Sequence, residues 1–154
     1  MKVKDIMTSD VKYCSLDTNL AAAAKIMWED DCGAVPVTDD RGKVVGMITD
    51  RDICIAGATR PRPEGEIPVR DLVSKSLYAC RPGDDVRTAM ETMKSQQVRR
   101  LPVIGQDVRL TGIVSIHDIA LQTLARKGAD IPAEDVLDTF IAITAPSQPR
   151  VAVS

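Results

Sequence analysis

The stretch GMITDRDI occupies residues 46 to 53, and a stretch of the same design, GIVSIHDI, occupies residues 112 to 119. In each, an apolar run leads into Thr or Ser, and Asp follows three positions later. This spacing is typical of a helix capping box, although Asp is a weaker partner there than Glu or Gln. It also suits a ligand, because a helix N-terminus attracts anions and a carboxylate can accept two hydroxyl groups.

The two stretches belong to a tandem repeat. A shift of 66 positions aligns residues 3 to 58 with residues 69 to 124 without a gap, and the apolar positions superpose together with ten identities. A duplicated structural unit is therefore predicted. The identical pairs are Val3/Val69, Asp5/Asp71, Cys14/Cys80, Ala23/Ala89, Met27/Met93, Pro36/Pro102, Val37/Val103, Gly46/Gly112, Asp52/Asp118 and Ile53/Ile119.

Each unit reads as strand, helix, strand, strand, helix. Apolar residues from Leu20 to Met27 recur at helical spacing, and the helix is expected to be capped by Asp17 or Thr18. The runs AVPVTD and VVGMIT, with the turn DRGK between them, predict two strands. One such unit alone would bury too little surface, so the predicted fold is a mixed α/β (α+β) body in which the two sheets pack together.

Beyond the repeat, IPAEDVLDTFIAIT predicts one more helix, with Val136, Phe140 and Ile143 on one face, and a loose tail follows it. The connector GATRPRPEGEIP is rich in proline and glycine and reads as either ordered or mobile. The expected boundaries are residues 1–58 for the first unit, 59–68 for the linker, 69–125 for the second unit and 126–154 for the C-terminal extension.

Composition narrows the classes of function. A net charge of -2 and a pI near 5.4 argue against binding to a nucleic-acid backbone, and an aromatic content of 3% argues against base stacking. The sequence has no apolar run long enough to span a membrane and no signal-peptide pattern at its start, so the expected compartment is the cytoplasm. Trp28 lies beside the helical apolar stripe, where it could cover the core or a dimer face.

The four cysteines, Cys14, Cys32, Cys54 and Cys80, are scattered singly, and only His117 could join them as a metal ligand. No structural metal is therefore expected, and the cysteines are predicted to be buried, reduced thiols.

Three features recur in order in both units: VKDIMT and VRDLVS at the start, GAVPVTD and RRLPVIG in the middle, and GMITDRDI and GIVSIHDI at the end. On these features, residues 1 to 125 resemble a tandem pair of CBS domains, the module named after cystathionine β-synthase. The whole chain is similar to the stand-alone two-CBS proteins of bacteria, including the hypoxic-response type. The resemblance implies a pseudo-two-fold pair, often a homodimer, with two clefts for AMP, ADP, ATP, NAD or S-adenosylmethionine.

The family's residue roles carry over by position. The resemblance implies ribose contacts for Asp52 and Asp118, phosphate contacts for the hydroxyl three residues before each, and adenine contacts near Ala34 and Arg100. Basic residues at the cleft mouth would hold the phosphates. The candidate ligand-binding residues are Thr49, Arg51, Asp52, Ser115, His117, Asp118, Arg99, Arg100, Ala34, Pro36 and Pro102, of which the two prolines are first of all strand and core residues.

The two units differ at one informative place. The first has Gly33 and Ala34 where the second has Arg99 and Arg100. The two clefts are therefore expected to be unequal, and the second, with Ser115, is expected to suit an anion better. The two arginines could equally be a solvated pair at a strand end.

No nucleophile with a partnered base, no glycine-rich phosphate loop and no carboxylate cluster stands out in the sequence. The predicted function is a non-enzymatic regulatory module that binds an adenosine-containing ligand and transmits its occupancy to a regulated protein partner. Two alternatives remain: an interaction scaffold with empty clefts, in which the motif only caps a helix, and an enzyme acting on a bound nucleotide.

Overall fold

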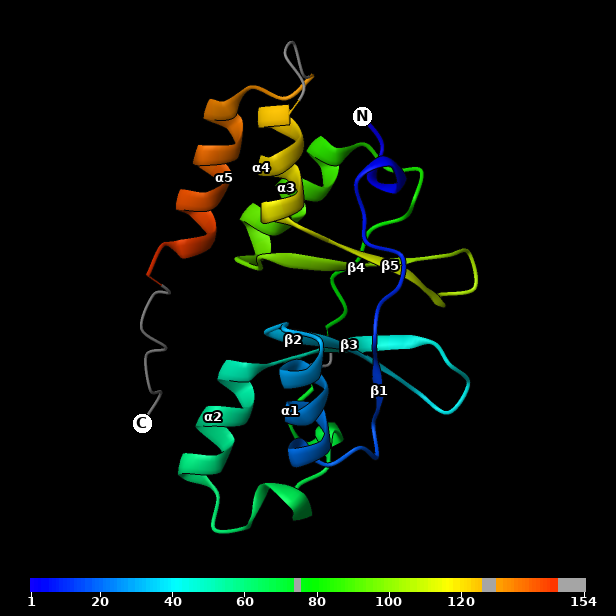
Figure 1. Cartoon of the computed structure of the whole chain (residues 1–154), viewed down its shortest axis with the longest axis vertical. Helices are drawn as coiled ribbons and strands as arrows, with labels where there is room; N and C mark the ends of the chain where they lie inside the picture. Colours follow the sequence, from blue (N-terminus) through cyan, green and yellow to red (C-terminus); the bar gives the residue numbers. More distant parts are fainter. Residues whose placement is uncertain (74–75, 126–129, 147–154) are drawn as a thin grey trace.

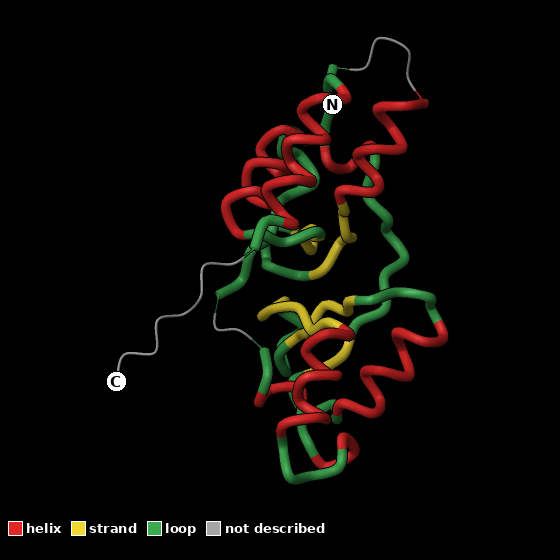
Figure 2. Tube along the Cα trace, turned by 90° about the vertical axis from the view of Figure 1, so that its left-hand side faces the viewer, coloured by secondary structure: helices red, strands yellow, loops and turns green. Residues whose placement is uncertain are grey.

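The computed structural model describes residues 1–73, 76–125 and 130–146, and it contains two units of the same design. In each, a helix, two paired strands and a second helix follow one another, which confirms the mixed α/β fold. The two small sheets face each other in the middle of the molecule with helices outside them (Figure 1), and a perpendicular view shows the same layers (Figure 2). The first unit contains α1 (Leu20–Glu29), β2 (Ala34–Thr38), β3 (Val44–Thr49) and α2 (Asp50–Thr59), and the second contains α3 (Val86–Gln96), β4 (Arg100–Ile104), β5 (Leu110–Ser115) and α4 (Ile116–Ala125).

The strand pairing repeats in detail. β2 and β3 are antiparallel with Ala34 opposite Thr49, and β4 and β5 are antiparallel with Arg100 opposite Ser115. The expected first strand is short: β1 (Cys14–Ser15) lies parallel to β2, and in the second unit it is reduced to one bridge between Cys80 and Val103. These registers place the ends of β3 and β5, which carry the two motifs, at matching edges of the two units.

The cap of α1 differs from the expectation. Asn19 is the capping residue, and its Oδ1 atom accepts the N–H of Ala22 at 2.8 Å. Thr18 does not cap the helix because its Oγ1 atom accepts the N–H of Ser15 at 3.1 Å, closing the preceding turn. The cap was therefore predicted at least one residue too early, because the Thr18 hydroxyl group is used by the turn before the helix.

The segments that precede the helices pack across the pair. Val3 and Ile6 belong to the hydrophobic core of the second unit, whereas Ile67 and Val69 belong to the core of the first. The connector between the units is ordered here, with a 3₁₀ turn at Glu64–Glu66 that leads directly into the fully buried Ile67. Each core is therefore completed by chain from outside its own helix–strand–strand–helix block.

The predicted C-terminal helix is confirmed as α5 (Ala133–Thr144), which packs against α3 and α4. Its buried stripe runs through Thr139 and Ile143, with Val136 partly buried, while Phe140 is 49% exposed. Val136 and Phe140 line one groove against α4, so they share a face as predicted, although Phe140 is not buried. Thr139, which was not predicted to face the core, is fully buried and donates its hydroxyl to the carbonyl of Asp135 at 2.7 Å. The predicted tail falls largely on residues 147–154, outside the described residues.

On the outer surface, Trp28 is 87% exposed, so it covers none of this chain's core. None of the described helices combines the length and the apolar character needed to cross a membrane.

Candidate functional site

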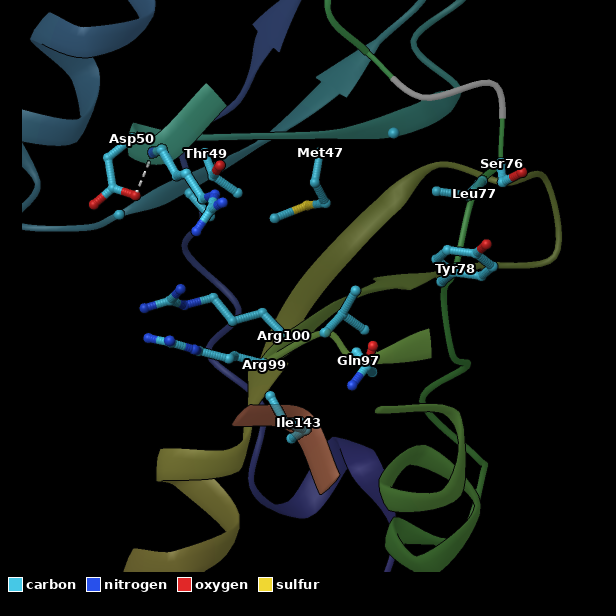
Figure 3. A pocket seen from close by; sticks show the side chains of 15 residues that line it. Met47, Thr49, Asp50, Ser76, Leu77, Tyr78, Gln97, Arg99, Arg100 and Ile143 are labelled. Atoms are coloured by element: carbon cyan, nitrogen blue, oxygen red, sulfur yellow. Dashed lines mark hydrogen bonds between the residues drawn. The ribbon is translucent and has the colours of Figure 1, made fainter. Parts of the chain in front are cut away.

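A cleft of about 590 Å³ lies between the two units. Its volume falls in the usual range of small-molecule sites, about 300–1,000 Å³. The first unit contributes the end of β3 and the start of α2, and the second contributes the start of β4, the segment after α3 and the last turn of α5 (Figure 3). The lining residues are Gly33, Ala34, Gly46, Met47, Thr49, Asp50, Arg51, Ser76, Leu77, Tyr78, Gln97, Val98, Arg99, Arg100 and Ile143.

Three arginines make one part of the cleft cationic. Arg51 comes from the first turn of α2, and Arg99 and Arg100 come from the start of β4, where their side chains run side by side (Figure 3). Among the described residues, no carboxylate forms a salt bridge with any of the three guanidinium groups. Unpaired, solvent-reachable guanidinium groups facing one cavity are well suited to a phosphate-bearing anion.

The other part of the cleft is largely apolar. Met47, from the first unit, and Ile143, from α5 beyond the second unit, lie on opposite walls, and Leu77 and Tyr78 lie on a third side (Figure 3). Tyr78 adds an aromatic ring that is 38% exposed. The cleft therefore offers an apolar surface next to a cationic one, which matches a flat heterocycle joined to phosphate.

At the start of α2, the first motif forms the capping box expected from its spacing. The N–H of Asp52 donates to Thr49 Oγ1 at 3.2 Å, and the N–H of Thr49 donates to Asp52 Oδ2 at 2.9 Å. Between these two residues, the N–H of Arg51 donates to Asp50 Oδ1 at 2.7 Å. An anion at this helix start would have to displace the Asp50 carboxylate, so the arginine side chains are the better anchor for it.

The second motif forms the same cap at the start of α4. The N–H of Asp118 donates to Ser115 Oγ at 3.2 Å, and Asp118 Oδ2 accepts both the N–H and the hydroxyl of Ser115, at 2.8 and 2.6 Å. No carboxylate corresponds to Asp50, because Ile116 occupies that position. His117 lines a separate, mostly apolar groove between α4 and α5, next to Phe140.

The cleft brings together some of the predicted residues and not others. From their place in the repeat, Arg99 and Arg100 were predicted to lie with the second motif, whereas they line one cavity with Thr49 and Arg51. The reason is that the two sheets face each other, so that the start of β4 lies across from the end of β3. Five candidates line the cleft, Ala34, Thr49, Arg51, Arg99 and Arg100, while Pro36, Asp52, Pro102, Ser115, His117 and Asp118 lie outside its lining.

Gly33 has a steric reason to differ from its counterpart Arg99. A Cβ atom at Gly33 would lie 2.9 Å from Asp50 Oδ2. A side chain at position 33 would therefore require the Asp50 carboxylate to move, and the second unit has Arg99 and Ile116 at these two positions. The difference between the units at Gly33 and Arg99 therefore extends to the first residues of α2 and α4, Asp50 and Ile116.

Several lining residues were not anticipated, including Met47, Leu77, Tyr78, Gln97 and Ile143. Met47 directly follows the motif glycine, so its position in the quoted stretch was an available signal. The others come from the second unit or the extension, and no local pattern connects them with the first motif.

The cysteine prediction is confirmed for two of the four residues. Cys14 and Cys80 are buried and free, and burial raises the pKa of their thiols to about 11 and about 12 respectively, with the nearby Asp84 carboxylate adding to the shift at Cys80. Cys54, by contrast, is exposed. Within the described residues, His, Cys, Asp and Glu side chains do not gather in groups of three that could hold a metal ion.

Both units of the chain match a known domain family. The sequence profile of the CBS domain matches residues 3–58 and again residues 69–122. The chain belongs to the CBS domain family. Among its relatives, hypoxic response protein 1 of Mycobacterium tuberculosis is 37% identical over 76% of this chain and 81% of the relative. The CBS domain-containing protein YhcV of Bacillus subtilis is 35% identical over 82% of this chain and 89% of the relative.

Solved structures show the same CBS pair. Hypoxic response protein I, solved with two coordinated zinc ions, superposes with a TM-score of 0.72 at 35% identity, covering 79% of this chain and 98% of that one. The CBS pair of protein MJ0100, solved with 5'-methylthioadenosine and S-adenosyl-L-methionine, has a TM-score of 0.74 at 24% identity over 82% and 98% of the two chains. CBSX2 in complex with AMP has a TM-score of 0.68 at 24% identity over 80% and 96%. At 24% identity, the last two support the fold alone.

Proposed function

We propose that this CBS pair is a non-enzymatic regulatory module whose central cleft binds an adenine nucleotide. In this proposal, the phosphates contact Arg51, Arg99 and Arg100, and the base lies against the apolar wall that includes Met47. The ribose faces the start of α2, where Asp52 Oδ1 forms no hydrogen bond with any described residue. The ligands solved with other CBS pairs, AMP and S-adenosyl-L-methionine among them, are of the same adenosine class.

The observation that carries this proposal is a set of three guanidinium groups, one from the first unit and two from the second, that line one cleft and form no salt bridge with any carboxylate of the described residues. Their positive charge favours AMP, ADP, ATP or NAD, all of which carry phosphate. It disfavours S-adenosylmethionine, because that ligand has a cationic sulfonium and no phosphate. Within the set of adenosine ligands, we therefore rank the phosphate-bearing ones first.

The cleft walls come from different units, and this is the basis of the proposed regulation. Met47 and Thr49 belong to the first unit, and Arg99 and Arg100 belong to the second. A ligand that contacts both walls stabilises one relative orientation of the units, and a partner protein that distinguishes orientations would respond to it. The partner we propose is another protein rather than a nucleic acid or a membrane.

Thermal melting with AMP, ADP, ATP, NAD and S-adenosylmethionine tests this function. A ligand at ~100 times its dissociation constant should stabilise the protein by about 2.7 kcal/mol. We expect phosphate-bearing ligands to raise the melting temperature, and Asp52→Ala to respond less than Asp118→Ala. Neither aspartate lines the cleft, but Asp52 is hydrogen-bonded to Thr49, which does. If no ligand changes the melting temperature, the scaffold with empty clefts is the correct reading instead.

An enzyme remains the minor alternative. His117 lies in the groove between α4 and α5 and not in the cleft, so the cleft has no imidazole base. Incubation with ATP followed by analysis of the nucleotide would reveal a product if this alternative were correct.

We also propose that the protein forms a homodimer in the cytoplasm. Exposed apolar side chains on both units support it, among them Trp28, Leu124 and Ile141, of which Leu124 is 80% exposed. Native mass spectrometry would detect the dimer and any nucleotide that co-purifies with it, and a strictly monomeric mass would refute this part.

A further inference from the structure

The C-terminal helix α5 lies outside the repeat, yet it forms part of the cleft. Ile143, in its last turn, is only 6% exposed, belongs to the core of the second unit, and lines the cavity (Figure 3). Among the described residues, the first unit has no equivalent of this helix, because α2 is followed by the connector and the second unit. The cleft wall is therefore completed by an element that the duplicated unit does not contain.

Gln97 connects this last turn to the cleft. Its Nε2 atom donates to the carbonyls of Ala142 and Ala145, both at 3.2 Å, and these carbonyls belong to the end of α5. Gln97 also lines the cleft and ends α3 in the left-handed conformation, with φ of 52°. One side chain thus joins the cavity wall, the end of α3 and the end of α5.

The beginning of α5 is held separately. Arg87 on α3 forms a salt bridge with Asp135 at 2.7 Å, and neither residue lines the cleft. The helix is therefore anchored in two places: its first turn by an ion pair outside the cleft, and its last turn by Gln97 and Ile143 at the cleft wall. Only the second anchor can sense a ligand.

Resting on the nucleotide function proposed above, we propose that the last turn of α5 is the element that responds to cleft occupancy. A ligand in the cleft contacts Ile143 and Gln97 only while this turn is docked, so binding shifts the local equilibrium toward the docked state. Linkage makes the effect reciprocal: loosening the turn must weaken nucleotide binding by the same factor that binding tightens the turn. The exposed side of α5, with Leu137 and Ile141, would carry the change to the surface.

The test compares two neighbouring glutamines. Gln97→Asn keeps an amide that tolerates the left-handed backbone but shortens the side chain by one methylene, so that it no longer reaches both carbonyls. Gln96→Asn makes the same chemical change at an exposed position whose side chain, among the described residues, bonds only to Ser95 Oγ, at 3.4 Å. Hydrogen exchange of the amides of residues 139–144 is measured for each protein with and without ATP and ADP, together with the nucleotide affinity.

We expect nucleotide to slow exchange in the last turn of wild type and of Gln96→Asn. We expect Gln97→Asn to exchange faster without ligand and to bind about fivefold more weakly, the low end of typical coupling. Binding with no change in exchange of these amides would overturn this inference and leave the nucleotide function standing, as would equal behaviour of the two variants. Absence of any binding to wild type would overturn both.

Discussion

The starts of α2 and α4 use the same cap in different surroundings. Both have a hydroxyl group that accepts the N–H of an aspartate three residues later, and both aspartates accept the N–H of the capping residue. The neighbours differ: Gly33 and Asp50 surround the first cap, and Arg99 and Ile116 surround the second. The repeated part of each motif therefore explains the helix start, and we propose that the unrepeated neighbours determine what the cleft can bind.

The strongest test of this difference removes the two arginines from the start of β4. Each charged hydrogen bond to phosphate contributes about 1.5–3 kcal/mol, so Arg99→Ala with Arg100→Ala should weaken nucleotide binding about 100-fold or more. Titration calorimetry would measure the change. Arg41→Ala with Arg81→Ala removes the same charge away from the cleft and should have little effect; equal losses in both double variants would mean that only net charge matters.

The two equivalent cysteines predict how the free energy of unfolding changes with pH. Burial raises the pKa of Cys14 to about 11 and that of Cys80 to about 12, while the ordinary thiol value is 9.0. Above pH 9 the unfolded chain releases thiol protons that the folded protein retains, so the free energy of unfolding falls as pH rises. The slope approaches about 1.4 kcal/mol per pH unit for each thiol.

Urea unfolding between pH 8 and pH 10.5 would measure this slope, and Cys80→Ala or Cys14→Ala should each flatten it. Cys54→Ala is the control, because that residue is exposed. A slope unchanged by both core variants would show that other groups cause the alkaline loss of stability.

Removing either cap should cost about 1 kcal/mol, because one helix N–H loses its partner. Thr49→Ala and Ser115→Ala are thus expected to destabilise the protein similarly in urea unfolding. Only Thr49→Ala should also reduce nucleotide affinity, since Thr49 lines the cleft and Ser115 does not. If Ser115→Ala proves to be the variant with impaired binding, the ligand lies at the second motif.

The smallest expected effect concerns Asp50, the carboxylate that the second unit lacks. Asp50→Asn removes an exposed negative charge beside the arginines, and we expect nucleotide affinity to rise about threefold, as for other exposed charge pairs. Asp40→Asn, in the β2–β3 turn, serves as the matched control in the same calorimetric titration. A lower affinity for Asp50→Asn would mean that its carboxylate binds the ligand.

Much of the fold could be predicted from the sequence, because a duplication fixes the order of elements and the caps follow from local spacing. Thr49 was predicted from the cap spacing and Arg51 from the resemblance to CBS domains, and both line the cleft. Their grouping with Arg99 and Arg100 was not found, since it depends on how the two units face each other. The contribution of Ile143 was also missed, because helical periodicity marks a buried side chain without saying that it reaches a cavity.

The segment that precedes the helices of each unit packs in the core of the other unit, and this affects how the molecule unfolds. Val3 lies in the core of the second unit and Val69 in that of the first, although the two residues are equivalent in the repeat. Loss of either unit therefore takes a piece of the other core with it. We therefore expect the two modules, which look separable along the chain, to unfold in one cooperative transition.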